Sequence, residues 1–187
     1  MVDIGVIGYG YWGPNIVRNF KAIEKTKVSI VCDIDHEALG RIRRVYSDVK
    51  TVSDPNEVLT SPVIDAVAII TPVFTHYELA KKALENGKHI FVGKPFTSKV
   101  SEAEELIELA ERNNLKIMVD HTFLFTGAVK KMKEIIDDNL LGQLYYYDST
   151  RVNLGLFQHD VNVLWDLAPH DLSIMDYLLE EKPAAIV

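Results

Sequence analysis

The sequence predicts an α/β protein built on a doubly wound parallel sheet, and three observations lead to this fold class. Short runs of β-branched residues alternate with longer segments of helical periodicity, which is typical of βαβ units. A glycine-rich segment follows the first of these runs directly and opens a helical segment. Proline, glycine and capping residues stand at the ends of the helical segments. We therefore expect parallel strands whose sheet is covered by helices on both faces.

The expected strands are short, apolar and rich in valine and isoleucine, as strands buried on both faces are. They cover Ile4–Ile7, Val28–Cys32, Lys50–Val52, Ala66–Ile70, His89–Val92 and Lys116–Val119.

Helix signals stand between these strands. Pro14 is placed where a missing N–H does no harm and predicts a helix over 14–25, and Asp54 followed by proline predicts a short helix. Gly87 predicts the end of a helix over 76–87. Ser101 and Glu104 have the spacing of a capping box, which predicts the start of the next helix.

After about residue 120 the alternation changes. Helices are expected over 128–139 and 161–180, and strands over 143–152 and from 183 to the last residue, 187. A length of 187 residues suits one domain of about 100–150 residues and a piece of another. We therefore expect a first domain over 1–120 and a partial second domain over 121–187.

Charge and cysteine content narrow the expected partners and compartment. The chain has 20 Lys and Arg against 27 Asp and Glu, so no basic excess neutralises a phosphate backbone and nucleic acid is not expected as a partner. The chain has no apolar run near the roughly 20 residues of a membrane span, so no membrane association is expected. One cysteine, Cys32, closes no intrachain disulfide and fits the reducing cytoplasm.

The glycine-rich segment reads Gly8-Tyr9-Gly10-Tyr11-Trp12-Gly13 and has the spacing of a dinucleotide-binding turn. Gly8 permits the tight turn, Gly10 lets the backbone approach a pyrophosphate, and Gly13 lets the helix pack close to the strand. Tyr11 and Trp12 belong to the same turn and are counted with the cofactor-binding residues. The segment predicts a Rossmann domain.

Asp33 supplies the second part of that prediction. It ends the second strand, 20 residues after Gly13, where a carboxylate accepts hydrogen bonds from the adenosine ribose. An anion at this place repels a 2′-phosphate, so NAD is expected as the cofactor in preference to NADP.

Two further loops follow the fourth and fifth strands. The first reads Thr71-Pro72-Val73-Phe74-Thr75-His76 and the second Gly93-Lys94-Pro95. Because ligands bind at the carboxyl ends of parallel strands, both loops should border the crevice of the glycine turn. By itself, Gly93-Lys94-Pro95 is more typical of a surface turn.

Several of these motifs, in this order, resemble one family. GYGYWG, Asp33, the TP…H loop, AKKALENGKHIFVGKP and WDLAPHD together resemble the glucose-fructose oxidoreductase, inositol dehydrogenase and MocA family of NAD(P)-dependent sugar dehydrogenases. Within it, HTFLF at 121–125, TRVNLG at 150–155 and DVNVLWDLAPHD at 160–171 are most similar to enzymes of nucleotide-linked amino sugars, such as UDP-N-acetylglucosamine 3-dehydrogenases and their uronic-acid relatives. The resemblance implies an oxidoreductase of a sugar secondary hydroxyl in polysaccharide biosynthesis.

The resemblance also implies roles for the second and third loops. The E-K-P motif of the family falls on Gly93, Lys94 and Pro95, so Lys94 would contact the nicotinamide end and the reacting hydroxyl, after a Lys-Pro bond expected to be cis. Gly93 departs from the family, whose glutamate bonds the nicotinamide ribose. Thr71, Pro72 and His76 would line the cofactor without taking part in catalysis.

Asp166 and His170 stand at i and i+4, so in a helix they share one face. The resemblance makes His170 the acid/base residue and Asp166 its neighbour, and a base that works near neutral pH suits removal of a hydroxyl proton. Lys94 with a lowered pKa is the alternative base. A helix-capping aspartate beside a histidine satisfied in a core is the structural alternative.

Other polar residues of the second domain are candidate ligands. His121, Arg151 and Asn162 are candidates for substrate contact, Arg151 because a guanidinium suits a phosphate or carboxylate. A metal held by Asp166, His170 and His159 or Asp171 is a less favoured alternative, since a nicotinamide enzyme with Lys and His needs no metal. No metal is therefore expected.

Two expectations concern the whole protein. Family members run to roughly 300–400 residues, so the chain is expected to be truncated in its second domain, with a strand edge that pairs with another copy into a homo-oligomer. The alternative to a small-molecule dehydrogenase is an NAD-binding sensor or regulatory protein, or a catalytically impaired variant, which Gly93 favours.

Overall fold

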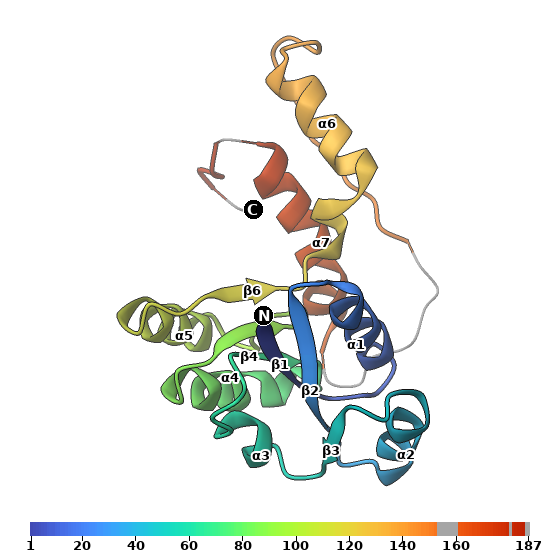
Figure 1. Cartoon of the computed structure of the whole chain (residues 1–187). Helices are drawn as coiled ribbons and strands as arrows, with labels where there is room; N and C mark the ends of the chain where they lie inside the picture. Colours follow the sequence, from blue (N-terminus) through green and yellow to red (C-terminus); the bar gives the residue numbers. More distant parts are fainter. Residues whose placement is uncertain (153–160, 180, 186–187) are drawn as a thin grey trace. The chain divides into compact units, whose positions relative to one another are not determined.

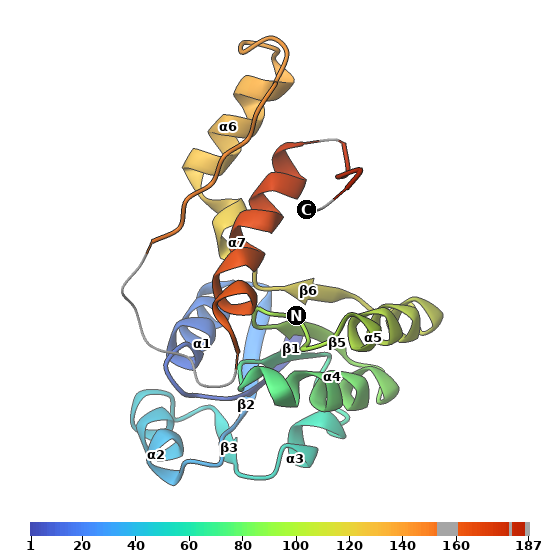
Figure 2. The same cartoon turned by 180° about the vertical axis from the view of Figure 1, so that it is seen from behind.

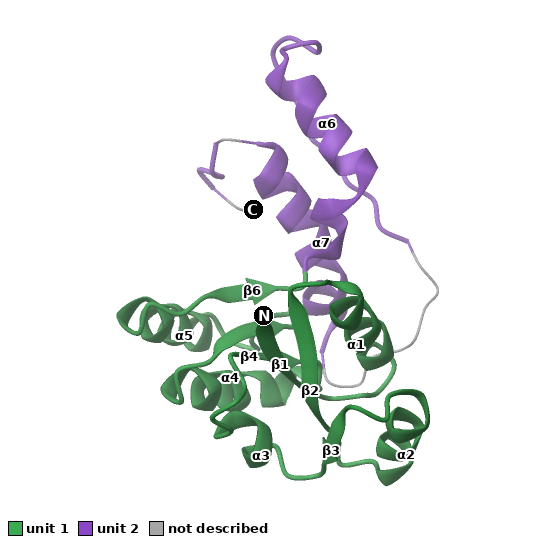
Figure 3. Cartoon of the chain, in the orientation of Figure 1, with its two compact units in different colours: residues 1–120 green, residues 121–187 purple. Residues whose placement is uncertain are grey.

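The computed structural model describes residues 1–152, 161–179 and 181–185. The chain divides into two compact units, Met1–Asp120 and His121–Val187, coloured separately in Figure 3. Each unit is described by itself.

Unit 1 (Met1–Asp120) is built on a six-stranded sheet in the order β3-β2-β1-β4-β5-β6, with every neighbouring pair parallel. This order confirms the doubly wound sheet, and it reverses direction between β1 and β4, the point at which ligands bind in sheets of this kind. The strands are β1 (Val2–Ile7), β2 (Thr26–Cys32), β3 (Lys50–Val52), β4 (Ala66–Ile69), β5 (His89–Val92) and β6 (Ile117–Val119).

Helices cover both faces of this sheet (Figures 1 and 2). One core joins α1 and α2 to sheet residues such as Val6 and Val31, and the other joins α3, α4 and α5 to residues such as Ile69 and Val92. The helices of the unit are α1 (Gly13–Ala22), α2 (His36–Val45), α3 (Asn56–Leu59), the 3₁₀ turn η1 (Val73–Thr75), α4 (His76–Glu85) and α5 (Val100–Arg112).

The capping box expected at Ser101 is wrong. Helix α5 begins at Val100, so Ser101 lies inside its first turn and Lys99 is the flanking residue. Ser98 donates a hydrogen bond to Glu102 instead. The backbone of Lys99 is extended and the helix begins at the next residue, Val100, one position before Ser101. The end at Gly87 is confirmed, since Gly87 takes a positive φ of 72° just after α4.

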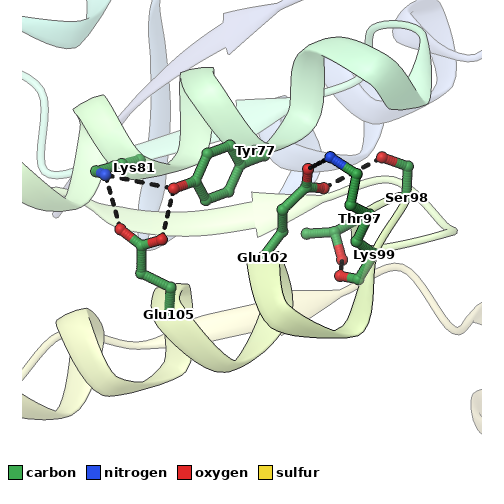
Figure 4. A network of polar contacts seen from close by, with 7 residues as sticks. All are labelled: Tyr77, Lys81, Thr97, Ser98, Lys99, Glu102 and Glu105. Carbon is green, nitrogen blue, oxygen red and sulfur yellow. Dashed lines mark hydrogen bonds and ion pairs between the residues drawn. The ribbon is translucent and has the colours of Figure 1, made fainter.

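Helices α4 and α5 are joined by a polar network on their outer side (Figure 4). Glu105 of α5 accepts hydrogen bonds from the Tyr77 hydroxyl at 2.6 Å and from Lys81 of α4 at 2.7 Å. The hydrogen bond to Glu105 raises the pKa of both Lys81 and Tyr77. This network holds the helix that begins at His76 against its neighbour.

Unit 2 (His121–Val187) is helical in its described part. It contains η2 (Thr122–Phe125), α6 (Gly127–Asp137) and α7 (Val163–Leu178), around a small core of Val129, Ile174 and Leu178. The strand expected over 143–152 is wrong, because no strand forms there. Of the strand expected from 183 to 187, residues 183–185 form none, and residues 186 and 187 lie outside the described residues. Tyr145 and Tyr146 are over four-fifths exposed. A strand requires a neighbour for its backbone groups, and the described part of this unit offers no strand to pair with.

A membrane span requires a helix that is both long and apolar. None of the helices in the described part of the chain combines the length and the apolar character that crossing a bilayer requires.

Candidate functional site

The glycine turn between β1 and α1 is the most constrained part of unit 1. Gly8 has a φ of 99°, and a Cβ at this position would lie 2.3 Å from the carbonyl oxygen of Ile70. A Cβ at Gly13 would lie 2.6 Å from the carbonyl oxygen of Gly8. Both positions therefore require glycine for the turn itself. At Gly10, by contrast, a Cβ would meet no atom of the described chain within 4 Å, so its glycine leaves open space above the backbone.

Helix α1 begins at Gly13, three residues after Gly10. Among the described residues no side chain caps the helix, and its first turn carries no acidic residue. Backbone N–H groups at a helix amino end attract anions when no side chain accepts from them. The bare turn and the uncapped helix fit a pyrophosphate, the part of a dinucleotide that such a turn holds.

Asp33 follows β2 at the same edge of the sheet. Its Oδ2 accepts from the Tyr9 backbone N–H at 2.5 Å, and its Oδ1 accepts from the Asp35 N–H at 2.8 Å. These two bonds fix the carboxylate beside the glycine turn. Each carboxylate oxygen retains a lone pair for a further donor, so the group fits a ribose hydroxyl.

Tyr11 and Trp12 lie at the mouth of the turn. Their rings stack with centroids 6.4 Å apart, and Tyr11 is 81% exposed. The Trp12 indole N–H donates to Asp120 Oδ2 at 3.0 Å. This bond ties the glycine turn to the end of β6. Asp120 is not among the residues predicted from the sequence, although its position directly after a strand is a signal that could have found it.

The loops after β4 and β5 are joined through His76. This histidine begins α4, is 2% exposed, and has Nε2 2.8 Å from the Thr71 carbonyl oxygen and Nδ1 3.0 Å from the Pro95 carbonyl oxygen. Pro72 lies between Thr71 and the 3₁₀ turn, and the Lys94–Pro95 bond is cis, as expected. The structure therefore brings Thr71, His76 and the Lys94–Pro95 turn together at the carboxyl edge.

Gly93 precedes this turn, and nothing in the backbone requires glycine there. A Cβ at Gly93 would lie 3.7 Å from the Ile69 carbonyl oxygen and 3.8 Å from His76 Cε1, which are ordinary contacts. The φ of Gly93 is not positive, unlike that of Gly8.

Cys32, just before Asp33, is a buried free cysteine. Burial raises the pKa of its thiol to about 12. A thiol with this pKa stays protonated near neutral pH and is a poor nucleophile.

Asp166 and His170 both lie on α7 in unit 2, as the spacing predicted. The His170 ring packs edge-on against Phe123 at a centroid distance of 4.7 Å. His121 lines an open cavity of about 750 Å³ together with Lys133, Ser173 and Asp176. The helix cap is Asn162, whose side chain accepts from the Trp165 N–H at 3.0 Å, so Asp166 is not the capping residue.

Arg151 forms a bidentate ion pair with Asp171 in unit 2. Its Nε and a terminal nitrogen donate to the two oxygens of Asp171 at 2.7 and 3.0 Å, and its guanidinium lies 4.7 Å from the Phe123 ring. Ser149 also donates to Asp171, at 2.9 Å. Arg151 and Asn162 thus each make a contact within unit 2 that forms without any substrate. Asp171 is adjacent to His170 in the sequence, but its partner Arg151 lies 20 positions away, so no local spacing pattern predicts the pair.

We expect Asp171→Asn to weaken the packing of unit 2 in a pH-dependent way. Arg151 holds the pKa of the Asp171 carboxyl below its usual value. The stabilisation is therefore complete above the unfolded pKa of about 4 and is lost as the pH falls through the lower folded pKa. At neutral pH the variant should lose about 1 kcal/mol of unfolding free energy.

The measurement is urea unfolding followed by Trp165 fluorescence in a Trp12→Phe background, since the chain has 2 tryptophans. The difference in unfolding free energy between this background and the same chain with Asp171→Asn should shrink in acid. Equal stability at neutral pH would show that the pair contributes nothing.

Metal-ligating side chains do not gather in the described part of the chain. No three His, Cys, Asp or Glu residues lie together there as a metal site needs. His159, considered above as a ligand, lies outside the described residues.

Comparison with known proteins agrees with this geometry. Residues 2–121 match the family model described as an oxidoreductase family with an NAD-binding Rossmann fold. Scyllo-inositol 2-dehydrogenase (NAD(+)) of Bacillus subtilis is 32% identical, covering 96% of this chain and 53% of that protein. UDP-N-acetylglucosamine 3-dehydrogenase of Acidithiobacillus ferrooxidans is 28% identical, covering 97% of this chain and 56% of that protein.

The fold is also found in solved structures. Scyllo-inositol dehydrogenase from Lactobacillus casei, solved with bound NAD(H) and scyllo-inositol, matches with a TM-score of 0.81 at 22% identity, covering 96% of this chain and 56% of that one. The chain spans about half the length of the curated relatives it matches. By its family match, its parallel sheet and its glycine turn, the chain belongs to the Gfo/Idh/MocA family of NAD-binding oxidoreductases.

Proposed function

We propose that the chain carries the cofactor-binding part of an NAD-dependent dehydrogenase that oxidises a secondary hydroxyl of a sugar. The observation that carries this proposal is the carboxyl edge of unit 1. There, Gly10 leaves room for a pyrophosphate, Asp33 after β2 is held in place for a ribose, and Lys94 follows β5, two strands along the sheet from β1. This set supplies both a place for the cofactor and an amine for the reacting hydroxyl.

The chemistry divides between cofactor and protein. Bound NAD supplies the two-electron acceptor for the carbon that loses its hydrogen. The chain supplies the base for the hydroxyl proton, which is Lys94 in unit 1 or His170 in unit 2, with Asp166 one helical turn before His170. Thr71, Pro72 and His76 contribute the wall of the cofactor site.

We propose a UDP-linked amino sugar or uronic acid of polysaccharide biosynthesis as the substrate, with His121, Arg151 and Asn162 as candidate contacts. The Acidithiobacillus relative is named for a UDP-linked amino sugar, which supports this class. Relatives named for inositols support the broader class of cyclic polyols with secondary hydroxyls.

The test is NADH formation, followed by absorbance, after the chain is mixed with NAD and one sugar at a time. UDP-N-acetylglucosamine, its uronic acid, scyllo-inositol and myo-inositol are the probes. We expect absorbance to rise with a UDP-sugar and to rise less or not at all with the inositols. Absence of NADH with all four, in the chain and in its Gly93→Glu variant, would overturn the proposal.

Gly93→Glu is expected to strengthen NADH binding. The backbone accepts a side chain here without strain, because a Cβ makes only ordinary contacts. A glutamate that accepts from the nicotinamide ribose adds a charge-assisted hydrogen bond, which corresponds to an affinity gain of about tenfold. NADH fluorescence titration measures it. Gly93→Ala is the matched control and should leave affinity unchanged, and an equal gain in both variants would contradict a role for the carboxylate.

A second candidate is an NAD-binding sensor without turnover, which the absence of a side chain at Gly93 favours. Calorimetry separates the two functions. The sensor is supported when calorimetry shows that NAD binds but neither Lys94→Ala nor His170→Ala changes the rate of NADH formation. The dehydrogenase is supported when either substitution lowers the rate of NADH formation.

We also propose that the protein works in the cytoplasm as a homo-oligomer associated through unit 2, where Tyr145 and Tyr146 are exposed. Light scattering of the chain and of a Tyr145→Ser/Tyr146→Ser variant tests this association. A monomeric mass for the unsubstituted chain would contradict it.

A further inference from the structure

The His76 side chain contacts the backbone of both loops at the cofactor edge of unit 1. Its Nε2 lies 2.8 Å from the Thr71 carbonyl oxygen, on the loop after β4, and its Nδ1 lies 3.0 Å from the Pro95 carbonyl oxygen, on the loop after β5. At 2% exposure, the ring is shielded from solvent. Water therefore does not replace either contact.

The imidazole acts as a rigid spacer between two acceptors. Carbonyl oxygens only accept hydrogen bonds, so a singly protonated ring donates to one of them and a doubly protonated ring donates to both. In either form the ring lies between the two carbonyl oxygens and fills the space that separates the two loops. Gly93 lies along the same ring, with its Cβ position 3.8 Å from Cε1.

The loop that carries His76 is itself held firmly. The Thr75 N–H and hydroxyl both donate to the Pro72 carbonyl oxygen, at 3.0 and 2.7 Å. The hydroxyls of Thr71 and Thr75 lie 2.6 Å apart. His76 then begins α4, whose Ala80 and Leu84 are fully buried in the core. Because this loop is fixed, contact with the His76 ring also fixes where Pro95 lies relative to it.

We propose that His76 is a positioning residue that sets the Lys94–Pro95 turn, and with it the Lys94 amine, at the nicotinamide end of the cofactor site. The inference rests on the proposed function, because it assumes that NAD binds along this edge. Its effect is local. It concerns the nicotinamide half of NAD, while Asp33 and the glycine turn hold the adenosine and pyrophosphate half.

Two conservative substitutions separate the two contacts of the ring. The amide nitrogen of asparagine reaches about as far as Nδ1 and keeps the bond to Pro95, whereas that of glutamine reaches about as far as Nε2 and keeps the bond to Thr71. His76→Asn should therefore preserve the Lys94–Pro95 turn and His76→Gln should release it. His76→Phe fills the volume without any donor.

The matched control is His89→Phe. His89 begins β5, at the opposite edge of the sheet, where its Nδ1 accepts from the Lys116 N–H at 3.0 Å. This variant also removes a histidine contact to backbone, but away from the cofactor edge. Melting temperature is recorded for every variant, so that a loss of fold is not read as a loss of binding.

The readout compares NADH with ADP-ribose, which lacks the nicotinamide, in fluorescence and calorimetric titrations. We expect His76→Gln and His76→Phe to weaken NADH binding about tenfold, His76→Asn and His89→Phe to stay within about threefold, and ADP-ribose binding to change little in all four. The inference is overturned when glutamine and asparagine behave alike, or when ADP-ribose weakens as much as NADH. Failure of the unsubstituted chain to bind either ligand would instead overturn the proposed function.

Discussion

We expect Gly10→Ala to weaken NADH binding by about 30-fold or more while the unfolding free energy changes by less than about 0.5 kcal/mol. A Cβ at Gly10 meets no atom of the described chain within 4 Å, so the turn accepts alanine. The methyl group would instead stand in the open space above Gly10, three residues before the start of α1, where the pyrophosphate must approach the backbone. NADH fluorescence titration and urea unfolding measure the two quantities.

Gly8→Ala is the contrasting variant, because its main expected effect is on the free energy of unfolding. Its positive φ and the Ile70 carbonyl oxygen, 2.3 Å from the added Cβ, together should lower the unfolding free energy by about 2–4 kcal/mol. Gly40→Ala, inside α2 with no atom of the described chain near its Cβ position, is the control and should not destabilise the fold. Equal NADH affinity in Gly10→Ala and the unsubstituted chain would remove the turn from the cofactor site.

Lys94→Ala should lower the rate of NADH formation by about 10²–10⁴-fold. Its amine is the group of unit 1 that the proposal places at the reacting hydroxyl, where it either takes the proton or binds the hydroxyl. NADH affinity should change by less than about threefold, because removal of the amine leaves the backbone of the Lys94–Pro95 turn in place beside the cofactor. Initial rates and NADH titration are measured on the same samples.

The control for Lys94→Ala is Lys99→Ala. Lys99 is 71% exposed in its side chain and pairs with Glu102, so its removal affects a surface ion pair of small energy. Its rate should stay within about twofold of the unsubstituted chain. A rate for Lys94→Ala equal to that of the control would show that the amine takes no part in the reaction.

The fold of unit 1 could be predicted from the sequence because its signals are local. Buried parallel strands are short apolar runs, and glycine and proline mark the ends of their helices. Expected and observed strands accordingly agree to within about two residues, from Val2–Ile7 to Ile117–Val119. The start of α5 was misplaced by a capping pattern, since a Ser and a Glu at the right spacing also occur inside a first turn.

The strand expected over 143–152 failed for a different reason. Its alternating aromatic residues have strand propensity, but a strand forms only when other strands pair with its backbone. In the described part of unit 2 there are helices and no strand, and residues 143–152 take an irregular path. Propensity thus predicted a conformation that depends on residues far away in sequence.

The candidate site divides in the same way. The glycines, Asp33, Lys94 and His76 were found from motifs, because strand ends in a parallel sheet converge at one edge. The bond from Trp12 to Asp120 spans 108 positions and the pair of Arg151 with Asp171 spans 20. No local pattern encodes such side-chain pairs, since they depend on how the folded segments meet.

The most direct test of a cofactor site in unit 1 is a titration of the chain with NADH and with NADPH under identical conditions. We expect NADH to bind, and NADPH to bind at least about tenfold more weakly, because the Asp33 carboxylate, held beside the glycine turn, would repel a 2′-phosphate. Binding of neither dinucleotide, or equal binding of both, would contradict the assignment of this edge to NAD.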